Sequence, residues 1–308
     1  MVKEKLSITE LGQEVAQVIE RRIPQAKVDV REVIKNNDLV LHGVTIRDTS
    51  KATNVSPTIY LENYFDKYLD DVKTVEEIAD QIIECNNALQ IETSIDSSMF
   101  TDFDNVKNNL GIKLVNTKKN EKFLESVPHK EFLDLSVIYQ VEVRIDENTG
   151  SFTIRNELMN KYGITLDELH KEALDSMKNR KVVTIIGMIE KIASLTMPAE
   201  SFEKLKELNA FEILDNGMIY ISNETKILGA TAILYEDTLK KLADIFKEDY
   251  YILPSSIHEV LAVKATGIYV EDLKAMVKET NAEHVEPDEV LSDNVYHYNI
   301  VTGELSIA

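Results

Sequence analysis

Residues 28–46 read VDVREVIKNNDLVLHGVTI, and this stretch decides the fold class. Apolar and polar residues alternate in it on both sides of the polar run Asn36-Asn37-Asp38. Alternation with a period of two is typical of half-buried β-strands, and a short polar run between two such patterns indicates a turn. We therefore expect strands at 28–34 and 39–46, which pair antiparallel because the connection is short.

A helical pattern follows this hairpin. Ser56 is a good N-cap residue and Pro57 is tolerated in the first turn, so we expect a helix to begin there. Tyr60, Tyr64 and Tyr68 then recur every four residues, which places them on one helix face. Such a stripe packs into a core or faces a partner, since Tyr is favoured at interfaces. The three tyrosines are therefore candidate binding residues.

The order of hairpin and helix recurs along the chain. Capping boxes predict two further helices, from Thr74 with Glu77 and from Thr165 with Glu168. Later strand pairs are expected at 133–145 with 151–154, 218–221 with 230–234, and 251–253 with 257–263. We expect helices at 237–246 and 270–280, and closing strands at 295–298 and 305–307. The predicted fold is α+β, with mostly antiparallel sheets built from repeated hairpin-then-helix units and helices on one face.

The chain is long enough for two packed units. It has 308 residues, of which 44% are apolar, so it can bury a core despite its charge. Polar residues at 179–181 and 196–198 bracket a short apolar segment. We expect an N-terminal α+β unit at 1–180 and a C-terminal α+β unit at 181–308, with the boundary between 178 and 198.

The formal net charge is −20, and it is unevenly distributed. Residues 1–110 hold 20 acidic and 12 basic residues, residues 111–198 hold 13 of each, and residues 199–308 hold 21 and 9. Phosphate binding requires clustered Lys and Arg, so direct binding of DNA or RNA is disfavoured. The main basic patch is formed by Lys118-Lys119 and Lys122, followed by His129-Lys130, and it is diluted by Glu121, Glu125 and Glu131. A strongly negative field favours a basic protein partner.

Cysteine content and hydropathy point to the cytoplasm. Cys85 is the one cysteine, so an intrachain disulfide is excluded, as is common in a reducing compartment. The first 15 residues lack the apolar core of a signal peptide. The longest apolar run, 182–189, is far shorter than a membrane span. We expect a cytoplasmic protein without membrane contact.

Ser256, His258 and Glu259 supply the residue types of a catalytic triad. Their close spacing argues against that arrangement, because a triad gathers its members from separate segments. A strand entry after Pro254 explains the run equally well. If these residues act in a hydrolase, distant carboxylates such as Asp134 or Asp293 would have to join them.

The remaining polar clusters do not match a metal signature. No histidine pair has zinc-ligand spacing. The run 283–289 is the densest group of oxygen ligands, and it lacks the glycine of a calcium loop. Its acids either form a solvated turn or contact a partner, and they are candidate binding residues: Glu283, Glu286, Asp288 and Glu289. Asp102-Phe103-Asp104 resembles a metal-binding Asp-x-Asp motif, but acids at a helix start explain it equally well. We expect no metal and no cofactor.

Three runs resemble a known family. They are 55–65 (VSPTIYLENYF), 252–261 (ILPSSIHEVL) and 289–296 (EVLSDNVY). They resemble DUF5688, an uncharacterised bacterial family whose members often lie beside mobile elements. The middle of the chain, around 132–135 and 168–174, is faintly similar to another uncharacterised bacterial family. The resemblance implies a bacterial cytoplasmic protein and supplies neither an activity nor a catalytic residue.

Three hypotheses of function remain. The first is a non-enzymatic binding or regulatory protein whose acidic regions engage a basic protein surface, one that otherwise holds nucleic acid. The second is a hydrolase or metal-dependent hydrolase that uses Ser256, His258 and Glu259. The third is a self-associating scaffold, in which a sheet edge or the tyrosine stripe pairs copies. The sequence does not determine the oligomeric state.

Overall fold

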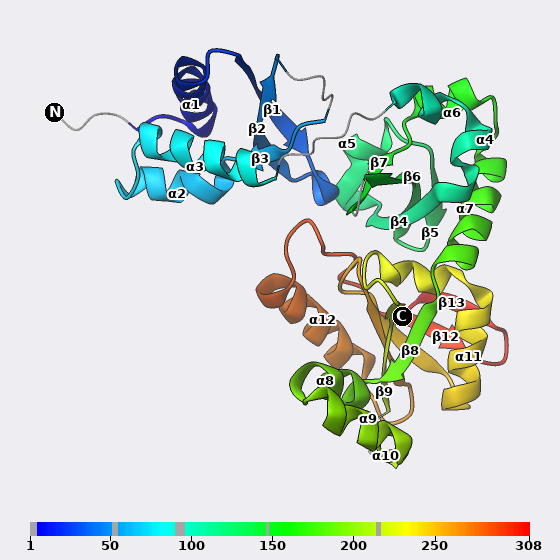
Figure 1. Cartoon of the computed structure of the whole chain (residues 1–308). Helices are drawn as coiled ribbons and strands as arrows, with labels where there is room; N and C mark the ends of the chain where they lie inside the picture. The colour runs from blue at the N-terminus through cyan, green and yellow to red at the C-terminus, as the bar shows by residue number, and fades with distance from the viewer. Residues whose placement is uncertain (1–4, 51–54, 90–95, 146–147, 214–216) are drawn as a thin grey trace. The chain divides into compact units, whose positions relative to one another are not determined.

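The computed structural model describes residues 5–50, 55–89, 96–145, 148–213 and 217–308. The chain forms two compact units, Met1–Phe100 with Arg144–Gly150 and Thr101–Val143 with Ser151–Ala308. Their elements are labelled in Figure 1. The structure is α+β with antiparallel sheets, so the predicted fold class is confirmed.

The first unit packs helices against a three-stranded sheet. Its strands have the order β1-β2-β3. Its elements are α1 (Ile8–Arg22), β1 (Ala26–Ile34), β2 (Val40–Asp48), β3 (Thr58–Tyr60), α2 (Glu62–Leu69) and α3 (Val75–Ala88). The first predicted hairpin is confirmed, with Val30 opposite Val44 and a 3₁₀ turn at Asn36–Asp38.

The core of this unit follows from two sequence patterns. The apolar stripe of α1 is buried at Leu11, Val15, Val18 and Ile19, and it meets Val44 and Ile46 of β2 and Ile78 and Ile82 of α3. Capping boxes start both helices, at Ser7 with Glu10 and at Thr74 with Glu77. Cys85 is half-buried and packs against this core.

The helix predicted from Ser56 begins later than expected. Residues Thr58–Tyr60 form β3, whose Ile59 lies opposite Val44, and α2 starts at Glu62. The run Thr-Ile-Tyr is β-branched and aromatic, and pairing with β2 outweighs the helical spacing of the tyrosines. Tyr60 therefore lies on a strand, and the predicted three-tyrosine helix face is wrong.

The second unit contains two sheets. The smaller has the order β4-β6-β5, with β7 beside β6. Its strands are β4 (Leu110–Asn116), β5 (His129–Phe132), β6 (Leu135–Ile145) and β7 (Asn148–Thr153), and the end of β6 and the start of β7 are assigned to the first unit. The helices beside it in the chain are α4 (Phe103–Val106), α5 (Glu121–Leu124), α6 (Asn156–Tyr162) and α7 (Leu166–Arg180). The capping box at Thr165 with Glu168 is confirmed.

The larger sheet has six antiparallel strands in the order β13-β12-β10-β11-β9-β8. Its strands are β8 (Val183–Gly187), β9 (Met218–Asn223), β10 (Tyr250–Leu253), β11 (Val260–Lys264), β12 (Tyr296–Asn299) and β13 (Glu304–Ile307). The helices of this region are α8 (Met188–Thr196), α9 (Ala199–Glu207), α10 (Ala210–Ile213), α11 (Glu236–Phe246) and α12 (Val270–His284).

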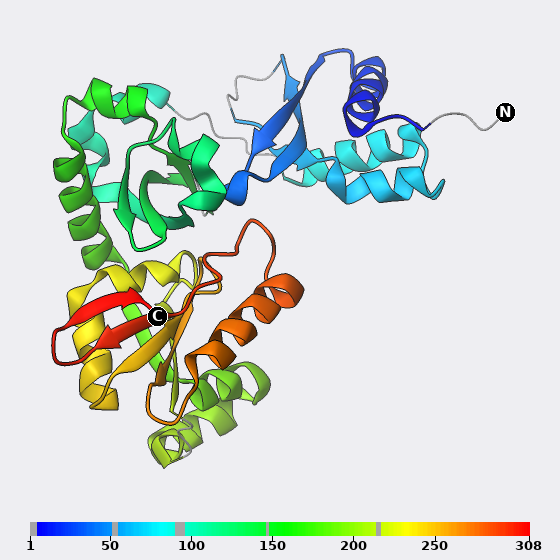
Figure 2. The same cartoon turned by 180° about the vertical axis from the view of Figure 1, so that it is seen from behind.

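Helices cover both faces of the six-stranded sheet, and not one face as predicted. The Tyr250 ring packs against Phe246 of α11, with 5.3 Å between ring centroids and a tilt of 38° between the rings. Leu253, which points to the other side of β10, packs with Leu273 and Val277 of α12. Figures 1 and 2 show α11 and α12 on opposite sides of the strands. The near-continuous apolar run in β10 agrees with a strand that is buried on both faces.

Two further details differ from the prediction. Residues 230–234 belong to a 3₁₀ segment, Gly229–Leu234, and not to a strand. Leu228 before it has a left-handed backbone with φ 56°, which turns the chain out of the sheet. The expected boundary between 178 and 198 lies inside the second unit, where β8 joins the sheet beside β9. At that point Arg180 and Lys181 both form ion pairs with Glu142 of β6, each with an N–O distance of 2.6 Å.

In the described part of the chain, the helices are too short or too polar to cross a bilayer.

Gly229 provides a stability test of the 3₁₀ segment. A Cβ atom there would approach Oγ of Ser222 and the carbonyl oxygen of His258 far closer than van der Waals contact. Overpacking of this kind costs about 1–3 kcal/mol, so Gly229→Ala should lower the free energy of unfolding in urea by that amount. Gly187→Ala is the matched control, because its Cβ would meet no atom within 4 Å. Equal unfolding midpoints for the two variants would contradict the packing described.

Candidate functional site

Two segments that carry the family resemblance lie side by side in the second unit. The backbone N–H of Ile257 donates to the carbonyl of Glu289 at 3.0 Å, and the N–H of Leu291 donates to that of Ser255 at 2.9 Å. Ser292 donates in the same way to Pro254 at 2.9 Å. These bonds join 254–257 to 289–292 as a two-stranded ribbon beyond the carboxyl end of β10.

His258 is held between two partners. Its Nδ1 accepts the backbone N–H of Leu228 at 3.2 Å, and its Nε2 lies 3.2 Å from Oε1 of Glu289. Because Nδ1 accepts a hydrogen bond, the proton of the neutral ring is on Nε2 and is donated to Glu289. The imidazole side chain is 25% exposed. The His258 ring therefore links the backbone at Leu228, through Nδ1, to Glu289 of the ribbon, through Nε2.

Ser256 has a backbone role. It is 5% exposed, and its Oγ accepts the backbone N–H of His258 at 3.0 Å. In this bond the hydroxyl contacts the main chain of His258 and not its ring, which is the geometry of a Ser turn. Glu259 is half-buried at the next position. The arrangement explains the Ser-Ser-Ile-His sequence as a rigid entry to β11.

Asp134 is the centre of a second polar cluster beside the ribbon. Its Oδ2 accepts hydrogen bonds from Oγ of Ser292 at 2.6 Å and from Nδ2 of Asn294 at 2.9 Å. Its Oδ1 accepts one from the hydroxyl of Tyr296 at 2.6 Å. Burial, together with the Asp134 carboxylate, raises the pKa of Tyr296 far above its ordinary value, so the phenol stays a donor. One carboxylate thus binds three consecutive inward-facing side chains of the closing segment.

The turn that presents Asp134 is conformationally demanding. Phe132 and Leu135 are paired across the hairpin, so Leu133 and Asp134 form a two-residue loop. Leu133 has φ 57° and Asp134 does not have a positive φ. A positive φ at the first loop position favours Gly, which has no Cβ atom to clash there. A branched residue there is strained, and the hydrogen bonds of Asp134 help to hold it.

Asp293 and Lys119 complete the cluster. Nζ of Lys119 lies 2.9 Å from Oδ2 of Asp293, while Nδ2 of Asn281 donates to Oδ1 at 2.7 Å. Burial opposes ionisation of Asp293, but the bonds from Asn281 and Lys119 hold its pKa below the ordinary value. Asn116 adds a bond from its side chain to the carbonyl of Leu291 at 3.1 Å.

Asp134 and Asp293 both bond side chains around the segment that follows the ribbon, whereas the His258 ring bonds Leu228 and Glu289. Their partners were missed in the sequence, although a signal was present. Ser292, Asn294 and Tyr296 alternate with other residues, which puts three hydrogen-bond donors on one side of an extended segment. The cluster binds the β5–β6 turn to the C-terminal sheet.

The tyrosines predicted as binding residues are mostly packed against other parts of the first unit. Tyr64 and Tyr68 are half-buried against the core of the first unit, and burial raises the pKa of Tyr64. The hydroxyl of Tyr68 accepts the backbone N–H of Leu6 at 3.3 Å. The Tyr60 ring is covered by the ammonium of Lys35, 4.7 Å from its centroid.

The acidic candidates follow α12. Glu283 and Glu286 are exposed, whereas Asp288 and Glu289 are half-buried. The carbonyl of Glu286 accepts the backbone N–H groups of Glu289 at 2.8 Å and of Val290 at 3.2 Å. This is the predicted turn. The described residues contain no group of three or more His, Cys, Asp or Glu side chains suited to a metal ion.

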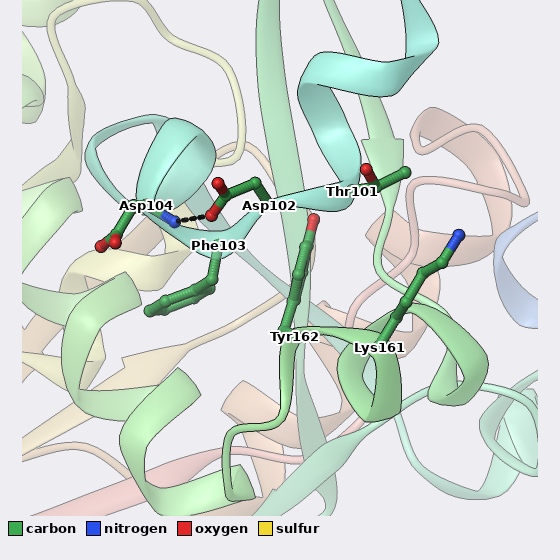
Figure 3. A pocket seen from close by; sticks show the side chains of 6 residues that line it. All are labelled: Thr101, Asp102, Phe103, Asp104, Lys161 and Tyr162. Atoms are coloured by element: carbon green, nitrogen blue, oxygen red, sulfur yellow. Dashed lines mark hydrogen bonds between the residues drawn. The ribbon is translucent and has the colours of Figure 1, made fainter.

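Asp102 and Asp104 lie at an open pocket of about 420 Å³, which Thr101, Phe103, Lys161 and Tyr162 also line. Figure 3 shows the Tyr162 ring between Phe103 and Lys161, with Oδ1 of Asp102 accepting the backbone N–H of Asp104. Asp104 pairs with Lys107 at 2.8 Å, and burial raises the pKa of Tyr162 to about 12. Asp102 caps α4, so the predicted helix start is confirmed.

Removal of the Asp134 carboxylate tests the central cluster. Asp134→Ala leaves buried donors of Ser292 and Tyr296 without an acceptor, which costs about 1–3 kcal/mol for each group. We expect the free energy of unfolding in urea to fall by about 2–4 kcal/mol. Asp244→Ala, at an exposed position of α11, should change it by less than about 0.5 kcal/mol. Similar losses in both variants would show that the three bonds do not stabilise the fold.

Asp293 predicts a pH dependence. Its pKa is lower in the folded state, so its contribution is present above the ordinary aspartate value and is lost as pH falls through the folded value. The stability difference between the wild type and Asp293→Asn should therefore be largest at neutral pH and shrink below about pH 4. Urea denaturation at a series of pH values measures it. A difference that stays constant from pH 7 to pH 3 would exclude the Lys119–Asp293 contribution.

Comparison with known proteins agrees with the resemblance of the three runs. The family described as "Family of unknown function (DUF5688)" matches residues 8–300, a span that holds both α1 and the ribbon. No curated protein and no solved structure matches the chain significantly. With its match extending from α1 to β12, the chain belongs to the DUF5688 family.

Proposed function

We propose that the protein is a binding protein that engages a basic protein surface through an exposed stripe of α12. The stripe is formed by Tyr269, Asp272, Met276, Glu279 and Glu283, and we call it the α12 stripe. It combines acidic and apolar side chains on one exposed helical surface, and this single observation carries the proposal.

The position of the stripe follows from the helix period. Asp272, Met276, Glu279 and Glu283 stand at i, i+4, i+7 and i+11, so they gather on one surface of the helix, and Tyr269 is the N-cap residue just before it. A different face of α12 is fixed to the sheet through Leu273, Val277 and Asn281, all of which are buried. Asn281 donates to the carbonyl of Ser292 at 2.9 Å, which ties the helix to the ribbon. The α12 stripe is therefore presented on a rigid element.

The charge of this region suits a cationic partner. Residues 270–289 contain seven acidic residues and two lysines. Lys274 is paired with Glu271 of the same helix at 2.9 Å, outside the stripe. Tyr269 is 79% exposed and Met276 is 39% exposed. Aromatic and Met side chains are enriched in interface centres, and acidic neighbours steer a basic partner.

The partner class follows from the same charges. A surface that is rich in Lys and Arg is what a nucleic-acid-binding protein presents to phosphates. Nucleic acid should therefore compete with this protein for the partner. We place this interaction in the cytoplasm, since a protein with one cysteine suits a reducing compartment.

Charge reversal on the α12 stripe tests the proposal. Wild-type protein immobilised on beads should retain a Lys- and Arg-rich protein from a lysate of its host at 50 mM salt and lose it at 500 mM salt, because screening weakens surface charge interactions. The double variant Glu279→Lys/Glu283→Lys should retain at least tenfold less of that protein. Addition of DNA or RNA should displace it from the wild type.

The matched control is Glu203→Lys/Glu207→Lys. These residues are exposed on α9 with the same four-residue spacing, so the change in net charge is identical. If the control loses the partner to the same extent, net charge alone explains the binding. If the stripe variant retains the partner fully, the α12 stripe is not the contact.

A further inference from the structure

We propose that Thr9, His42 and Glu62 form an acyl-accepting site, in which the hydroxyl of Thr9 takes the acyl group of an ester. The site lies in the first unit and is independent of the α12 stripe. It would give the protein a chemical activity in addition to binding.

The three side chains form a hydroxyl–imidazole–carboxylate chain. Oγ1 of Thr9 lies 3.4 Å from Nε2 of His42. Nδ1 of His42 lies 2.9 Å from Oε1 of Glu62. The residues come from α1, β2 and α2, so the fold and not the local sequence brings them together. A nucleophile bonded to a base, with the base oriented by a third group, is how such sites are recognised.

The backbone holds the carboxylate and the ring in place. Oε1 of Glu62 also accepts the backbone N–H of His42 at 2.8 Å, and the N–H of Leu61 donates to the carbonyl of His42 at 2.9 Å. The side chains of His42 and Glu62 are 15% and 31% exposed. Oε2 of Glu62 is buried and has no hydrogen-bond partner among the described residues. Glu62 can therefore stabilise a positive charge that develops on the ring.

The tautomer required for base catalysis follows from these bonds. A carboxylate only accepts hydrogen bonds, so Nδ1 of His42 carries the proton that faces Glu62. In the neutral ring Nε2 is then the acceptor, and it faces the hydroxyl of Thr9. This differs from His258, where the acceptor nitrogen receives a backbone N–H.

The reaction is an acyl transfer followed by hydrolysis. Oγ1 of Thr9 forms a bond to the carbonyl carbon of the ester while its proton passes to Nε2 of His42. The bond from that carbon to the leaving oxygen then breaks, and the leaving oxygen takes the proton from Nε2. Water, deprotonated by the same nitrogen, next attacks the acyl-threonine, which releases the acid and restores the hydroxyl.

The start of α1 can stabilise the oxyanion of the intermediate. The first N–H groups of an α-helix lack intrahelical acceptors, and the helix dipole favours negative charge there. Ser7 caps the N–H of Glu10 through its Oγ at 3.3 Å. The N–H groups of Ile8 and Thr9 precede the first intrahelical bond, which runs from Leu11 to Ser7.

Neighbouring charges define the class of substrate. Oε1 of Glu32, across the hairpin, lies 4.0 Å from Nε2 of His42, and Glu10 is exposed on the first turn of α1. These carboxylates repel anionic acyl groups, so the substrate class is a neutral or cationic ester. Thr9 is exposed and its hydroxyl is secondary, so acylation should be slow but should leave a measurable adduct.

The test uses the full chain and 4-nitrophenyl acetate. Peptide mass mapping of the wild type should find an acetyl group on Thr9. Thr9→Val and His42→Gln should reduce acetylation of that peptide at least tenfold, and Glu62→Gln should reduce its rate similarly. Thr9→Ser should retain the adduct, because it keeps the hydroxyl and removes a methyl group. Thr196→Val, at another exposed threonine, should leave acetylation unchanged.

The rival arrangement is an ion pair between protonated His42 and Glu32. In that case Glu32→Gln would alter the site and Thr9→Val would not. We expect Glu32→Gln to change the acetylation rate by less than twofold. Acetylation confined to lysines, or unaffected by Thr9→Val in a folded variant, would overturn the proposal. Neither result bears on partner retention by the α12 stripe.

Discussion

The hydrogen bonding of the Asp134 carboxylate is the interaction on which the second unit depends. Its three donors, Ser292, Asn294 and Tyr296, lie in the segment that leads into β12. That segment also pairs with 254–257 and accepts a bond from Asn281 of α12. A half-buried carboxylate loses part of its hydration and is stabilising only when all of its bonds form, so it specifies one arrangement of the smaller sheet, the ribbon and α12.

The placement of α12 links this interaction to the proposed function. The helix is anchored by apolar contacts and by Asn281, which leaves its remaining surface free to carry charge without affecting the core. The acidic side chains of the α12 stripe therefore lie on the exposed surface of a helix that is packed in place. Their charges stay in solvent and need not destabilise the fold. The polar clusters at His258 and Asp134 hold backbone and side-chain groups of the second unit in place. Thr9 and His42 belong to the first unit, where the Thr9 side chain is exposed.

Local patterns predicted much of this fold. The first hairpin, the capping boxes at Thr74 and Thr165, and the helix after β11 follow from alternation and from N-cap chemistry, which act over a few residues. The failures at 58–60 and 230–234 have a common cause. In both places a tertiary contact, pairing with β2 or the close approach of Gly229 to His258, outweighs the local preference.

The candidate sites could not be predicted from local patterns, because tertiary contacts bring their residues together. The run Ser256 to Glu259 offered the right residue types at adjacent positions, and adjacency is what prevents them from converging. His42 and Glu62 are 20 residues apart, and Thr9 is 33 residues before His42. Only the packing of α1 against the hairpin brings these residues within hydrogen-bond distance.

The sequence separation of Asp134 from its donors has a consequence for biosynthesis. The three bonds span 158, 160 and 162 residues. At a synthesis rate of about 5–20 residues per second, the carboxylate leaves the ribosome roughly 10 to 30 s before its donors. During that interval the turn at Leu133 and Asp134 lacks the three hydrogen bonds that the Asp134 carboxylate accepts in the folded protein. The hairpin therefore cannot reach its native contacts until the segment that holds Ser292, Asn294 and Tyr296 has been synthesised.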